Sequence, residues 1–147
     1  MLSALSSLRD KAQQSKSQSE IDSFLQAVIL AEGESGKYLN AITGSNCSDC
    51  PCRGKDIRNI AVGDACYISW MNVLSTVQAA SGGLVSNLNK MLRDPWGSPY
   101  GLDENEGATP VGCVNDGFAS AGPDGVLWNA DDIRIEIPLT ARPASCP

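Results

Sequence analysis

Four aspartates near the C-terminal end are the side chains whose spacing best suits binding chemistry. Asp116, Asp124, Asp131 and Asp132 lie within 17 residues and are interleaved with three glycines. Calcium takes roughly six to eight oxygen ligands, and glycines let a loop fold tightly enough for backbone carbonyls to converge. The spacing does not match an EF-hand, which needs acidic residues at alternate positions and a late glutamate. A solvated tight turn at Asp124, with Asp131 capping a short bend, is the alternative interpretation.

Six cysteines in 147 residues are a high and even count. Two interpretations compete: a disulfide framework in an exported protein, and a zinc site built on residues 47–52 (CSDCPC). No second C-x-x-C motif completes a zinc site, so disulfides are favoured. The first three cysteines are too close in sequence to pair comfortably with one another, which predicts partners among the last three. The pairing itself stays open for Cys47, Cys50, Cys52, Cys66, Cys113 and Cys146.

The composition argues against several functional classes. The chain contains no histidine, which removes the commonest general base, the usual catalytic triads and zinc sites built on imidazole. Its net charge of −6 and its isoelectric point near 4.5 do not provide the basic surface that nucleic-acid binding requires. We therefore predict no catalytic residue and no nucleic-acid partner, and an acidic surface compatible with calcium.

The order of expected elements predicts a single α+β domain. Apolar residues recur at spacings of three and four over residues 2–32, which predicts one long helix ending near the glycines that follow. Residues 33–66 are typical of a cysteine-rich loop, and residues 67–92 of helix interrupted at two adjacent glycines. From residue 94 onwards, turns and short strands predict a small antiparallel sheet, with the alternating run 133–137 (IRIEI) as its clearest strand.

Two segments together resemble a known family. Residues 94–100 read DPWGSPY, and residues 120–125 read SAGPDG, followed by ADDI at 130–133. In this order, after a long helix, they resemble the major pseudopilin of the type II secretion system and related type IV pilin-like proteins. Residues 8–12 (LRDKA) are similar to the point where the membrane-embedded half of a pilin's first helix gives way to the soluble half. The cysteine-rich loop at 44–66 departs from the family pattern.

The resemblance implies a pilin-like fold and a structural role. The expected function is that of a subunit of a type IV pilus or a type II secretion pseudopilus. Its expected partners are copies of itself, other pilin-like subunits and the inner-membrane assembly machinery. The chain has no signal peptide and no apolar run of about 18 residues, so we expect a native hydrophobic N-terminal helix to precede this sequence. The resemblance implies that this helix anchors the precursor in the inner membrane and later forms the filament core through which the subunits polymerise, with the head in the periplasm or at the cell surface.

The family also binds calcium in its C-terminal loop. Carried over to this sequence, the resemblance makes Asp124, Asp131 and Asp132 the side-chain candidates, with backbone carbonyls near Ser120 and Val126 as additions. The calcium-type loop favours a secretion pseudopilin, whereas the cysteine-rich loop favours a surface pilus, where covalent links resist shear. A secreted calcium-dependent binding or adhesion module is the alternative function.

Overall fold

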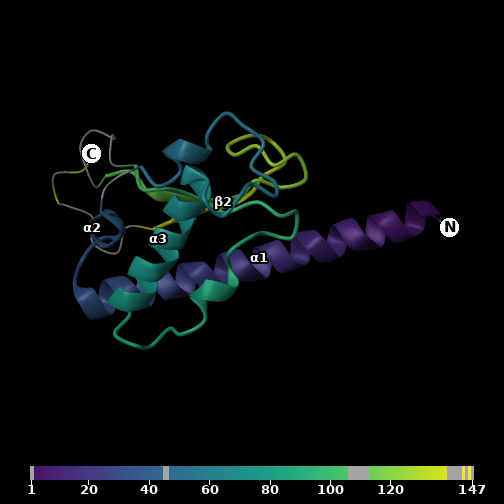
Figure 1. Cartoon of the computed structure of the whole chain (residues 1–147). Coiled ribbons are helices and arrows are strands. Elements are labelled where there is room, and N and C mark those ends of the chain that lie inside the picture. Colours follow the sequence, from purple (N-terminus) through teal and green to yellow (C-terminus); the bar gives the residue numbers. More distant parts are fainter. Residues whose placement is uncertain (1, 45–46, 106–112, 139–143, 145, 147) are drawn as a thin grey trace.

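The computed structural model describes residues 2–44, 47–105 and 113–138, together with residues 144 and 146. The architecture is α+β, with a long N-terminal helix and a small antiparallel sheet, as the sequence predicts (Figure 1). The helical elements are α1 (Leu2–Ser35), α2 (Leu39–Thr43), α3 (Ala65–Ala80) and two 3-10 turns, η1 (Cys50–Cys52) and η2 (Leu88–Lys90). The strands are β1 (Gly101–Asp103), β2 (Asp116–Ser120) and β3 (Ile133–Ile137).

The three strands pair in the order β1-β2-β3, all antiparallel, and the predicted strand at 133–137 is confirmed. Leu102 lies opposite Phe118, which lies opposite Ile135. Because successive side chains of a strand point to opposite faces, this row and its alternate neighbours face the helices. The intervening positions, which include Gly117 and its partner Glu136, form the outer face of the sheet.

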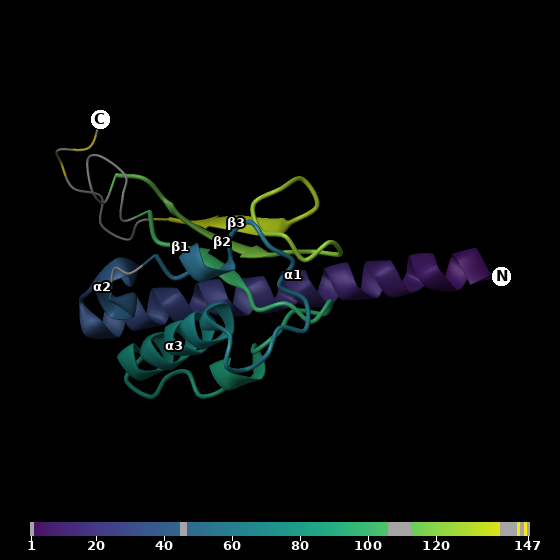
Figure 2. The same cartoon turned by 45° about the horizontal axis from the view of Figure 1, so that its top comes forward.

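A cluster of aromatic rings joins the helices to the sheet. Phe118 of β2 has its ring centroid 4.3 Å from that of Phe24 in α1, 5.5 Å from Trp70 in α3 and 5.3 Å from Tyr100. All four side chains are almost fully buried. Both long helices lie on the same side of the sheet (Figure 2). The main core therefore fills the space between the sheet's inner face and the two helices.

Helix α1 is longer than its packing surface. It runs to Ser35, three residues beyond the predicted end, and its buried face begins at Ser17 and Ile21. Every residue from 2 to 12 is exposed, and this part projects from the rest of the molecule (Figure 1). We call residues 2–16 the stem. Among the described residues, no helix is both long and apolar enough to cross a membrane.

The predicted loop at 33–66 contains more regular structure than its composition indicated. The carboxylate of Glu32 accepts a hydrogen bond from the backbone N–H of Leu39 at 3.0 Å, which starts the short helix α2. Helix α3 begins two residues before the predicted start of its segment, because Asp64 caps it by accepting from the N–H of Cys66 at 2.8 Å. Side-chain acceptors thus create helix starts within a segment that lacks apolar periodicity.

Only some of the apolar side chains of α3 are buried. Leu74 and Val77 are buried, whereas Ile68 and Met71 are 45% and 44% exposed. The buried face is centred instead on Trp70, whose indole N–H donates to the carbonyl of Met91 at 2.7 Å. Anchoring this large ring turns the neighbouring positions of the helix toward solvent.

The predicted break at Gly82 and Gly83 is confirmed. Helix α3 ends at Ala80, and the two glycines have φ values of +61° and +89°, a region that side chains rarely adopt. The helical stretch expected beyond them is reduced to η2. Leu88 and Met91 are buried there, while Leu84 is 59% exposed.

Candidate functional site

Asp94 physically joins the two segments on which the family resemblance rests. Its carboxylate Oδ1 accepts from the backbone N–H groups of Trp96 at 3.0 Å and Ser98 at 2.9 Å, which shapes the 94–100 turn. Its Oδ2 accepts from the hydroxyl of Ser120 at 2.6 Å, at the start of the second segment. Asp94 is only 4% exposed, and burial raises the pKa of its carboxyl although these hydrogen bonds oppose the rise.

The acidic loop after β2 is closed by its own carboxylates. Asp124 accepts from the N–H of Val126 at 2.8 Å and from the side-chain amide of Asn129 at 2.7 Å. Asp131 accepts from the N–H of Asp124 at 3.3 Å. Gly122 has a φ of +62°, and a Cβ there would lie 2.6 Å from the carbonyl oxygen of Asp131. The glycine therefore permits the two ends of the loop to meet.

Asp132 is the carboxylate of this loop with a buried oxygen that lacks a hydrogen-bond partner among the described residues. Its Oδ2 accepts from the N–H of Trp128 at 2.5 Å, while its Oδ1 is buried with no hydrogen-bond partner among the described residues. Desolvation raises the pKa of Asp132, and the nearby charges of Asp131 and Asp124 add to the rise. A buried, partnerless oxygen in a set of carboxylates is chemically suited to a hard cation.

The three predicted carboxylates share one loop, but they do not converge on one point. Within the described part of the chain, the single group of three candidate metal ligands within 4.8 Å is Cys47, Asp49 and Cys50, and its two sulfurs form a disulfide. The structure also shows the polar groups of the two additional candidate residues. The hydroxyl of Ser120 donates a hydrogen bond to Asp94, and the backbone N–H of Val126 donates one to Asp124.

The cysteines form three disulfides, as the sequence predicts: Cys47–Cys50, Cys52–Cys66 and Cys113–Cys146. The expectation that the first three cysteines would not pair with one another is wrong. A turn closed by the N–H of Cys50 and the carbonyl of Cys47, at 3.0 Å, brings their Cα atoms within 5.3 Å. Cys113–Cys146 links two residues that lie 33 positions apart in the chain. Three disulfides indicate an oxidising compartment.

The cysteine-rich loop is bonded to both family-like segments. The N–H of Ile57 donates to the carbonyl of Gly125 at 2.9 Å, and the N–H of Asn59 donates to the carbonyl of Gly97 at 2.9 Å. The guanidinium of Arg58 donates to the carbonyl of Pro123 at 2.9 Å. The spacing of residue types in the sequence does not predict these contacts. The cysteine-rich loop therefore supports both the 94–100 turn and the 120–125 turn through hydrogen bonds.

A buried carboxylate in the cysteine-rich loop also organises the outer face of the sheet. Asp49 is fully buried and its Oδ2 accepts from Nε of Arg53 at 2.7 Å and from the indole N–H of Trp128 at 2.6 Å. Arg53 also pairs with Asp103 of β1 at 3.0 Å. Sequence analysis missed this network, because Asp49 looks like an ordinary turn residue between two cysteines.

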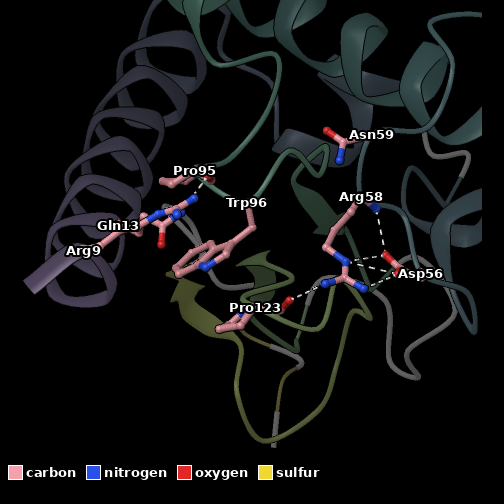
Figure 3. A pocket seen from close by; sticks show the side chains of 8 residues that line it. All are labelled: Arg9, Gln13, Asp56, Arg58, Asn59, Pro95, Trp96 and Pro123. Atoms are coloured by element: carbon pink, nitrogen blue, oxygen red, sulfur yellow. Dashed lines mark hydrogen bonds and ion pairs between the residues drawn. The ribbon is translucent and has the colours of Figure 1, made fainter. Parts of the chain in front are cut away.

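A polar hollow of about 430 Å³ lies where the stem meets the head (Figure 3). Arg9 and Gln13 line it from α1. Trp96 lines it from the 94–100 turn, Pro123 from the 120–125 turn, and the Arg58–Asp56 ion pair from the cysteine-rich loop. Gln13 donates from its side-chain amide to the carbonyl of Pro95 at 3.1 Å. The 94–100 turn therefore fastens the base of the stem.

No protein-family model matches the chain, and neither the curated proteins nor the solved structures contain a significant match.

Proposed function

We propose that this chain is the stem and head of a structural subunit of a type IV pilus or a type II secretion pseudopilus. The observation that carries the proposal is the projecting stem. Leu2, Leu5 and Leu8 are 87%, 64% and 63% exposed on it. Their spacing of three residues puts them near one another on one side of the helix, where no other described element covers them.

An exposed row of leucines favours association. Burying apolar surface stabilises by about 25 cal/mol per Å², and a full leucine side chain by roughly 2 kcal/mol. A stem that projects from one end of a head can pack against a different surface on the next copy, and such head-to-tail contacts generate open helical filaments. The row of leucines on a free helix therefore suits a filament subunit better than a monomeric enzyme.

The stem has a fixed orientation relative to the head, which a filament subunit requires. Besides the Gln13 contact with Pro95, the hydroxyl of the buried Tyr100 donates to the carboxylate of Glu20 on α1. Burial and the Glu20 charge raise the pKa of Tyr100 far above its usual range, so the phenol stays protonated and remains a donor. The direction of the stem is therefore fixed by side-chain hydrogen bonds between α1 and the head rather than by a loose linker.

Replacing Leu5 and Leu8 together by aspartate tests this proposal. Both side chains are exposed, so we expect the free energy of unfolding to change by no more than about 0.5 kcal/mol. In cells that produce the full-length protein, we expect filament assembly to be lost, because two charges would enter an apolar contact. Val62→Asp is the matched control, since Val62 is 69% exposed in the head and lies outside the stem.

The proposal includes the partners and location that follow from such a role. The subunit would assemble with its own copies and with other pilin-like subunits, after extraction from the inner membrane by the assembly machinery. Residues upstream of this sequence distinguish it from the alternative of a secreted binding or adhesion module. A short basic leader ending in glycine and followed by a hydrophobic stretch supports the filament subunit, whereas a conventional signal peptide supports the secreted module.

Calcium binding by the acidic loop is a second proposal, supported by the buried and partnerless Oδ1 of Asp132. Asp124, Asp131 and Asp132 would have to draw together around the ion to hold it, with backbone carbonyls near Ser120 and Val126 as further ligands. The ion would supply the positive charge that offsets the mutual repulsion of these carboxylates. Its role here is structural, because the loop packs against the cysteine-rich loop through Gly125.

Thermal melts in calcium and in excess EGTA test the calcium proposal. A ligand that binds only the folded state stabilises it by about 2.7 kcal/mol at one hundred times its Kd, so we expect a Tm several degrees higher in calcium. Asp132→Asn should abolish the difference, whereas Asp22→Asn, an exposed change on α1, should preserve it. Equal melting temperatures of the unmodified chain in calcium and in EGTA would show that the loop holds no ion.

A further inference from the structure

A second hollow, of about 450 Å³, lies on the outer face of the sheet, away from the helices and the stem. We call it the outer-face hollow. It opens over the start of β2, where Gly117 has no side chain. An aromatic ring and several amide and charged groups surround it: Trp128, Asn105, Asn115, Arg134 and Glu136.

Trp128 is held in this hollow by two buried or half-buried carboxylates. Its backbone N–H donates to Asp132 and its indole N–H donates to Asp49. Its φ is +71°, a left-handed conformation that bulky side chains rarely adopt. The ring lies against Gly117, where an added Cβ would be 3.3 Å from the indole. Both the strained backbone and the small residue beneath it serve to place one aromatic ring at one position on the sheet.

Polar groups line the hollow beside this ring. The side-chain amide of Asn115 donates to the carboxylate of Glu136 at 3.1 Å, and that of Asn105 donates to the carbonyl of Asn115 at 2.5 Å. Arg134 is exposed on the same face of β3, two residues from Glu136. The hollow therefore offers amide and guanidinium donors together with carboxylate and amide acceptors within reach of an apolar ring.

We propose that the outer-face hollow binds a neutral sugar unit of a glycan. A pyranose ring has an apolar face of C–H groups, which packs on an aromatic side chain, and a rim of neighbouring hydroxyls. Each hydroxyl both donates and accepts, so paired amide, carboxylate and guanidinium groups match that rim. Arg134 and Glu136 carry opposite charges, and Asp116 adds a second carboxylate to the lining, so an anionic ligand is disfavoured and a neutral one is accommodated. The volume is in the usual range for small-molecule sites.

The sugar site does not depend on filament assembly. The sheet's outer face points away from α1 and α3 (Figure 2), so packing of stems leaves it accessible. A chain whose stem fails to assemble can still bind sugar, and a chain that assembles can fail to bind it. The two proposals can therefore fail separately.

Titration of the folded chain with cellotriose, maltotriose and chitotriose, each to about 20 mM, tests the sugar site. The readout is the indole N–H signal of Trp128 in a ¹H–¹⁵N spectrum, with Trp70 and Trp96 as internal references. We expect at least one sugar to shift the Trp128 signal alone. Arg134→Ala and Glu136→Gln should each raise the Kd about tenfold. Arg9→Ala, an exposed change in the hollow beside the stem, should leave the Kd unchanged.

Either of two outcomes would overturn the inference. One is that no sugar of the panel shifts the Trp128 signal. The other is that a shift persists with an unchanged Kd in both Arg134→Ala and Glu136→Gln. Both substituted side chains are exposed, so an unaltered Tm in each variant verifies that the comparison is made on folded protein.

Discussion

Replacing Asp94 by alanine should lower the free energy of unfolding by about 3 kcal/mol. The substitution removes the acceptor for two backbone N–H groups, those of Trp96 and Ser98, and for the hydroxyl of Ser120. Ser98 and Ser120 are fully buried, so water cannot replace the lost carboxylate without opening the turn. The 94–100 turn would then separate from the end of β2, and the acidic loop would lose its anchor.

Asp94→Asn is the matched control, because the amide keeps one oxygen for the two N–H groups and presents an N–H₂ to the Ser120 hydroxyl. We expect a loss of only about 1 kcal/mol for this variant. Urea unfolding of both variants and of the unmodified chain measures the difference. If Asp94→Ala and Asp94→Asn unfold at the same urea concentration, the carboxylate does not hold the two segments together.

Removing the Cys52–Cys66 disulfide by a double change to alanine should cost about 3 kcal/mol. The bond spans 14 residues and links η1 to the first turn of α3. Both cysteines are buried in a second core with Ile57, Ala119 and Leu127. Opening the bond therefore frees a loop in the unfolded chain and also removes buried sulfur from this core.

The Cys47–Cys50 bond is the control for that change. It spans only three residues, so it restricts the unfolded chain less than the longer Cys52–Cys66 loop does. Cys50 is exposed, so removing the bond disturbs no core. We expect a loss about 1 kcal/mol smaller than for Cys52–Cys66, measured by urea unfolding under non-reducing conditions. A larger loss for the exposed pair would mean that the second core contributes little to stability.

The parts of the fold that sequence analysis predicts are those with a local cause. The long helix shows in the spacing of residues such as Ile21, Phe24 and Val28, which are all fully buried. Strand β3 shows in strict alternation, and the end of α3 shows in two adjacent glycines. Each signal lies within a few residues of the element that it determines, so it can be found without knowing the fold.

The missed features arise from contacts between distant residues. The start of α2 depends on Glu32 reaching Leu39, and the buried face of α3 depends on Trp70 reaching Met91. The Asp49 network joins residues 79 positions apart in the chain. Side-chain bonds of this kind leave no periodic trace in the sequence, so composition and spacing predict them poorly.

The sequence singles out the acidic residues of the candidate site but not Asp94. The acidic residues do share one loop, but the role of Asp94 as the bond between the two family-like segments was not foreseen. Those segments look like separate turn motifs in the sequence, and Asp94 looks like the residue that merely precedes a proline. The hydrogen bond from Ser120 gives a physical reason for the two motifs to occur together.

The most direct test of the filament proposal is the assembly of full-length protein carrying Leu5→Asp and Leu8→Asp, compared with Val62→Asp. The amount of filament sheared from cells, relative to the folded protein inside them, is the quantity to measure. We predict that the stem variant folds with an unchanged Tm and yields no filament, while the head variant yields the normal amount. Normal filament yield from the stem variant would contradict the proposal that the exposed leucines are part of the assembly surface.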